Sequence, residues 1–156
     1  MKQKGKFINK KGMALDYIFN RCTSKNICLI VPGLGEDIKE ESYSKISEIL
    51  NRKNISTVRI NLSNNKLDEL NFEMVRLSEH INDICIAYNK FSSTYENIYL
   101  FGFSFGSVSA FIVSAIKPIK KQILCSPGYF YDYLSKKDKE KIFFDFVQDL
   151  KNHPWK

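Results

Sequence analysis

The 156-residue sequence lacks several features that would mark a special class of protein. It has only four cysteines, without C-x-x-C spacing and with three of them inside apolar runs, which argues against a zinc site or disulfide framework and favours buried, reduced thiols. No apolar run approaches the roughly 18 residues that a membrane helix needs, and the first residues lack the apolar stretch of a secretory signal. We therefore expect a cytoplasmic protein with no membrane partner.

The charge balance is basic but does not indicate a nucleic-acid site. There are 24 Lys and Arg residues against 17 Asp and Glu, a net charge of +7, and such a field attracts polyanions in general. The lysines are scattered, however, and those near residue 140 alternate with acidic residues as on a solvated helix face. We expect no nucleic-acid partner. With 44% hydrophobic and 26% charged residues, the chain has the composition and length of one folded domain.

Hydrophobic patterning predicts strands and helices that alternate along the chain. Two short strands at 6–9 and 13–19, separated by a Lys-Lys-Gly turn, predict an antiparallel hairpin. The apolar run 27–31 ends at a Pro-Gly pair, which is typical of a strand buried on both faces of a parallel sheet. The elements predicted after it are a helix at 43–50, a strand at 57–62, a helix at 74–88, a strand at 98–101, a helix at 107–116 and a strand at 122–125. This order predicts an α/β protein: a mostly parallel sheet with helices on both faces.

Residues 102–106, Gly-Phe-Ser-Phe-Gly, are the strongest chemical signal. They follow an apolar strand and open a helix of small and apolar residues, the setting in which a serine at a sharp turn is exposed as a nucleophile. Gly102 and Gly106 satisfy the need for small residues where strand and helix pack closely. The amide of Phe105 and the helix dipole can stabilise negative charge beside Ser104. A glycine-rich turn with a capping serine is the simpler alternative.

With this motif in its setting, the sequence resembles the α/β-hydrolase superfamily, in particular small esterases and serine-aminopeptidase-like members. The hairpin and the strand at 27–31 match too, and Pro32–Glu36 stands where the family has His-Gly-x-Gly, with proline in place of histidine. The resemblance implies that Leu34 donates a second oxyanion amide. It also implies a serine hydrolase acting on carboxylic esters or related acyl compounds, with a small-molecule acyl substrate, no cofactor and no metal.

The resemblance further implies one domain over residues 1–156, with the core sheet and helices in 1–128 and a helical, lid-like tail in 129–156. In that tail, apolar residues between 142 and 150 recur at helical spacing, and no further strand follows. The family places its acid and its histidine after two such strands, in the order serine, acid, histidine. We therefore expect a hydrolase fold that is incomplete at its C-terminal end.

Only two histidines could serve as the base. His80 precedes Ser104 and lies in the predicted helix 74–88, where we expect a surface or boundary residue far from the turn at Ser104. His153 follows Ser104, and Asp132 is the acid with the most suitable place in the chain, but chain order does not establish geometry and His153 is three residues from the end.

Two other interpretations stay open. Without acid and base, the chain would be a truncated, catalytically inactive hydrolase-fold protein or a binding module, and its strand 122–125 would be an apolar sheet edge open to self-association. A nucleotide-binding α/β protein is disfavoured, because Gly33-Leu34-Gly35 lacks a third glycine at the required spacing and no Walker lysine follows. Aromatic residues around Ser104 could line an apolar acyl site or simply pack the core.

Overall fold

A computed structural model describes residues 2–65 and 75–126. Its strands are β1 (Lys2–Ile8), β2 (Ala14–Asn20), β3 (Asn26–Val31), β4 (Ser56–Ile60), β5 (Asn97–Phe103) and β6 (Lys121–Cys125). Its helices are α1 (Glu41–Arg52), α2 (Leu77–Ser92) and α3 (Phe105–Ile116). Each element predicted between residues 6 and 125 is present. The largest boundary shifts are at the start of β1, which begins several residues earlier than predicted, and in α2, which begins and ends several residues later than its apolar stripe suggested.

The strands form one six-stranded sheet in the order β1-β2-β4-β3-β5-β6. The hairpin strands β1 and β2 pair antiparallel, and β2 pairs antiparallel with β4. The pairs β3–β4, β3–β5 and β5–β6 are all parallel. The predicted mostly parallel sheet with an N-terminal antiparallel hairpin is therefore confirmed. Because β3 and β5 are adjacent and parallel, the chain segments that leave their carboxyl ends lie at the same edge of the sheet.

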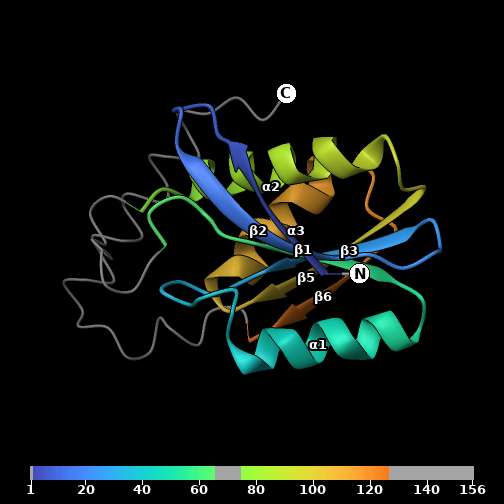
Figure 1. Cartoon of the computed structure of the whole chain (residues 1–156). Coiled ribbons are helices and arrows are strands. Elements are labelled where there is room, and N and C mark those ends of the chain that lie inside the picture. The colour runs from blue at the N-terminus through green and yellow to red at the C-terminus, as the bar shows by residue number, and fades with distance from the viewer. Residues whose placement is uncertain (1, 66–74, 127–156) are drawn as a thin grey trace.

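Helices cover both faces of the sheet, α2 and α3 on one and α1 on the other (Figure 1). Strand β3 is covered by helices on both faces of the sheet, which explains why its sequence is continuously apolar. Leu29 and Val31 belong to the core between the sheet and helices α2 and α3. Cys28 and Ile30 lie on the other face and pack against Tyr43 of α1. All four of these side chains are buried, as a strand covered on two faces requires.

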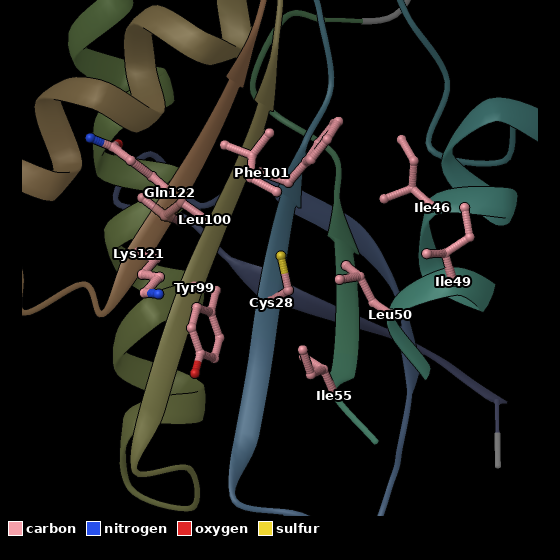
Figure 2. Close-up of a pocket in the computed structure, with 11 residues that line it drawn as sticks. Cys28, Ile46, Ile49, Leu50, Ile55, Tyr99, Leu100, Phe101, Lys121 and Gln122 are labelled. Atoms are coloured by element: carbon pink, nitrogen blue, oxygen red, sulfur yellow. The ribbon is translucent and has the colours of Figure 1, made fainter. Parts of the chain in front are cut away.

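On the α1 face, an apolar groove remains open between the helix and strands β5 and β6. Figure 2 shows Ile46 and Ile49 of α1 on one side, Tyr99 of β5 on the other, and Cys28 of β3 at its floor. Its volume is about 430 Å³. Within the described part of the chain, β6 pairs with β5 alone and forms the sheet edge, where Ile123 is 56% exposed.

None of the helices in residues 2–65 and 75–126 combines the length and the hydrophobicity needed to cross a bilayer.

Candidate active site

Ser104 is the single residue between the end of β5 and the start of α3. Its backbone has φ 50° and ψ −123°, a conformation that costs a residue with a side chain free energy. Two hydrogen bonds hold it there: the Ser104 amide donates to the Cys125 carbonyl at 2.9 Å, and its carbonyl accepts from the Ser107 amide at 2.9 Å. The half-buried serine therefore stands on a strained strand-to-helix turn.

The two glycines of the motif permit close packing on either side of this turn. A Cβ added to Gly102 would lie 2.7 Å from the Cα of Ser107, inside the first turn of α3. A Cβ added to Gly106 would lie 2.2 Å from the carbonyl oxygen of Pro32. Both distances are far below van der Waals contact, so the glycines are needed for approach and not for a left-handed backbone. Gly106 also brings the start of α3 directly against the end of β3.

The side chain of Ser107 ties the turn to the neighbouring strand. Its hydroxyl lies 2.8 Å from the carbonyl oxygens of both Gly102 and Cys125 and is fully buried. One hydroxyl hydrogen is thus shared between β5 and β6, beneath the first turn of α3.

The loop after β3 lies beside this turn and carries Leu34. Its first amide, that of Gly33, donates to Glu36 Oε2 at 2.7 Å and to the hydroxyl of Tyr43 at 3.1 Å. The Tyr43 hydroxyl in turn donates to Glu36, and burial raises the pKa of Tyr43, so this phenol stays protonated. The amide of Gly35, two residues after Gly33, donates to Asn65 Oδ1 at 3.0 Å. No residue of the described part accepts a hydrogen bond from the Leu34 amide between them.

The amide of Phe105 is the first of α3, so it has no acceptor within its own helix. No acidic side chain lies in the first turn of α3 to use the positive end of its dipole. Leu34 and Phe105 thus follow two adjacent parallel strands at one sheet edge, each with an amide free of partners in the described part of the chain.

The environment of His80 differs from the prediction. The expected surface or boundary residue is fully buried, and its ring packs edge-on against the ring of Phe105, with centroids 5.4 Å apart. Its Nε2 lies 2.9 Å from the Ser63 carbonyl oxygen, which can only accept, so Nε2 carries the hydrogen. Burial lowers the pKa of His80 to about 4, which makes the ring neutral at physiological pH. The contact with Phe105, the residue after Ser104, shows that the prediction of a position far from this turn is wrong as well.

A buried polar network surrounds this histidine. Asp83, one helical turn further along α2, accepts hydrogen bonds from both the amide and the hydroxyl of Ser63, at 2.8 and 2.7 Å. The Ser63 hydroxyl also accepts from the side-chain amide of Asn9, which follows β1. Burial raises the pKa of Asp83, and the hydrogen bonds from Ser63 partly oppose that shift. The network fixes the segment after β4 to α2 and to the hairpin.

The acid and base inferred from chain order, Asp132 and His153, lie outside the described residues. The lid-like tail 129–156 lies outside them too. Among residues 2–65 and 75–126, His80 is the only histidine, and its Nε2 is already bonded to Ser63. In the same ranges, no three His, Cys, Asp or Glu side chains form a group that could hold a metal ion.

The aromatic neighbours of Ser104 point to opposite sides of the sheet. Phe103 packs with the cluster under α1, and Phe105 packs with the cluster under α2 and α3. Both are half-buried, so core packing accounts for much of their surface. The sequence analysis did not single out Asn65, and no motif marks it, because its partners Gly33 and Gly35 lie at least 30 residues away in the loop after β3.

Comparison with known proteins relates the chain to α/β-hydrolase structures. No protein-family model and no curated protein matches the sequence. Among solved structures, Est1E from Butyrivibrio proteoclasticus, determined with bound ferulic acid, is 22% identical with a TM-score of 0.67, covering 80% of this chain and 53% of that one. XC6422 from Xanthomonas campestris, described as an α/β serine hydrolase without a lid, is 14% identical with a TM-score of 0.70, covering 88% and 65%. A bacterial brefeldin A esterase is 10% identical with a TM-score of 0.69, covering 90% and 44%. The chain thus spans between 44 and 65% of the length of these structures.

Proposed function

We propose that this chain, which has the α/β-hydrolase fold, is a serine hydrolase that acts on carboxylic esters or related acyl compounds through Ser104. The observation that carries the proposal is the strained turn at Ser104, which stands at the start of α3 beside two amides without partners in the described residues. Strain of this kind gathers at functional sites, because surrounding structure must stabilise it. Here the two backbone hydrogen bonds of Ser104 hold the turn, and the close packing at Gly102 and Gly106 surrounds it.

The proposed reaction is acyl transfer to Ser104 followed by hydrolysis. The Ser104 hydroxyl attacks the ester carbonyl carbon and its proton passes to a base, while the carbonyl oxygen becomes an oxyanion held by the amides of Leu34 and Phe105. The alcohol leaves with a proton, and water then cleaves the acyl-enzyme to release the carboxylic acid and restore the serine. Asp132 and His153 remain the proposed acid and base.

One observation favours a second function, that of a catalytically inactive hydrolase-fold binding module. The only histidine of the described residues is buried and neutral. Its Nε2 is bonded to a backbone carbonyl and its Nδ1 is buried without a hydrogen-bond partner in those residues, so neither nitrogen accepts a proton from Ser104 in that arrangement. Loss of a triad member removes most of the rate of such enzymes. The fold and the turn would then serve binding.

Fluorophosphonate labelling of Ser104 separates the two functions. The probe phosphonylates an activated serine with loss of fluoride, and intact mass with peptide mapping identifies the residue. We expect the wild-type protein to label at Ser104 and to hydrolyse p-nitrophenyl acetate, and Ser104→Ala to do neither. If the wild type labels no faster than Ser104→Ala, the hydrolase proposal fails and the binding-module alternative is favoured.

A further inference from the structure

Asn65 clamps the loop that carries Leu34. It belongs to the segment that follows β4 and is only 4% exposed. Its Oδ1 accepts from the Gly35 amide at 3.0 Å, and its Nδ2 donates to the Gly33 carbonyl at 2.9 Å. These two partners define the orientation of the side-chain amide, because a backbone amide can only donate and a carbonyl can only accept. The two bonds lie on either side of Leu34 and join segments at least 30 residues apart in the sequence.

The clamp leaves one donor of the loop unused. The amide of Gly33 is bonded to Glu36 and Tyr43, and the amide of Gly35 is bonded to Asn65. Only the Leu34 amide between them has no acceptor in the described part of the chain. A peptide held on both sides, with its own N–H unpaired, is preorganised to accept an incoming anionic oxygen without rearrangement.

The clamp itself is rigidly supported. Two residues before Asn65, the Ser63 carbonyl accepts from His80 Nε2, and the Ser63 amide and hydroxyl donate to Asp83. The ring of His80 packs in turn against Phe105. The segment 63–65 therefore contacts both strand-to-helix connections: the Leu34 loop through Asn65, and the turn at Phe105 through His80. Such a supporting layer limits the small displacements that weaken an oxyanion site.

We propose that Asn65 is a positioning residue, which fixes the peptides around Leu34 so that the Leu34 amide faces the oxygen of an acyl group bound at Ser104. The inference rests on the proposed hydrolase function. Asn65 does not touch the reacting atoms; it acts through the two backbone bonds to Gly33 and Gly35.

The test compares Asn65→Ala and Asn65→Asp with the wild type in the rate of fluorophosphonate labelling at Ser104. Asn65→Ala loses both bonds, whereas Asn65→Asp keeps an acceptor for Gly35 and loses the donor to Gly33. We expect Asn65→Ala to slow labelling by about tenfold or more, since removing one oxyanion donor costs roughly a hundredfold to a thousandfold. Asn51→Ala is the matched control, because Asn51 makes a similar side-chain bond to the Ile55 carbonyl at 2.8 Å, outside the site.

A spectroscopic readout separates positioning from general loosening. In ¹⁵N–¹H spectra of the wild type, phosphonylation should move the amide resonances of both Leu34 and Phe105 downfield. In Asn65→Ala the Leu34 shift should shrink while the Phe105 shift persists, which a merely destabilised fold would not produce. If Asn65→Ala does not fold, Asn65→Asp carries both measurements.

Each remaining outcome overturns the inference. Wild-type labelling rates and Leu34 shifts in the Asn65 variants would show that the clamp is irrelevant to the amide. Equal slowing in Asn51→Ala would attribute the effect to lost stability. A wild-type protein that does not label at all would overturn the proposed function, and the role of Asn65 with it; that failure is distinct, because it appears before any Asn65 variant is compared.

Discussion

The ring of His80 stands edge-on against the ring of Phe105, with centroids 5.4 Å apart and ring planes at 79°. This contact joins α2 to the first residue of α3 and places a fully buried, neutral imidazole behind the turn at Ser104. Its hydrogen bond to Ser63 links the same ring to the segment that clamps the Leu34 loop. His80 is therefore a structural element of the candidate site.

Buried His80 should make the protein less stable in acid. Its pKa is about 4 in the folded protein against 6.5 for the free side chain, so between these values the unfolded chain binds a proton that the folded protein does not. The free energy of unfolding then falls as pH is lowered through this window, by roughly 3 kcal/mol for this residue. Asp83, whose pKa is raised by burial, contributes with the opposite sign.

The variant His80→Gln isolates this contribution, because glutamine does not titrate and Asp83 is unchanged. We expect urea unfolding between pH 4 and 7 to show a shallower loss of stability in His80→Gln than in the wild type. Parallel curves for the two proteins would contradict the assignment of the acid sensitivity to His80.

Gly106→Ala should destabilise the protein strongly. The new methyl would lie 2.2 Å from the Pro32 carbonyl oxygen and 2.7 Å from that of Val31, and neither is the flexible end of a side chain. We expect a loss of about 3 kcal/mol or more in chemical denaturation, or failure to fold. Gly12→Ala is the control: its φ of 78° costs roughly 1 to 2 kcal/mol, but nothing lies within 4 Å of the added methyl. Equal effects of the two substitutions would refute the packing argument.

Ser107→Ala should cost about 1 to 3 kcal/mol of unfolding free energy, because the Gly102 and Cys125 carbonyl oxygens beneath α3 lose the buried donor that they share, although Cys125 keeps the Ser104 amide. Ser114 lies on the same helix, and its exposed hydroxyl donates to the Phe111 carbonyl. We expect Ser114→Ala to change stability by less than about 0.5 kcal/mol. Thermal and urea unfolding of both variants measure the difference in their free energies of unfolding. Equal stability of the two variants would contradict a role of Ser107 in joining β5 to β6.

Among the described residues β6 is an outer strand of the sheet, and this leads us to propose self-association of the chain. Ile123, on the edge strand, is 56% exposed, and an unpaired apolar edge is a template for pairing with another chain. We expect sedimentation velocity to show concentration-dependent association of the wild type, reduced in Ile123→Lys. Phe111→Lys is the control, since Phe111 is 58% exposed on α3. If the wild type is monomeric, or if both substitutions reduce association equally, the β6 edge is not the site of contact between chains.

The sequence by itself determined the elements and the turn. The continuous apolar run of β3, the helical spacing of apolar residues in α1 and α2, and the small residues around Ser104 are local patterns, and each depends on neighbours a few positions away. The mostly parallel sheet follows from their alternation, so it too was predictable.

Only the tertiary structure decided the surroundings of the turn. His80 lies on the apolar stripe between Leu77 and Ile84, yet its burial is tolerable only because the Ser63 carbonyl, 17 residues away, accepts its hydrogen. Asn65 likewise acquires its role from Gly33 and Gly35, at least 30 residues before it. Such partners meet only when parallel strands bring their carboxyl ends to one edge, so no local pattern in the sequence specifies them.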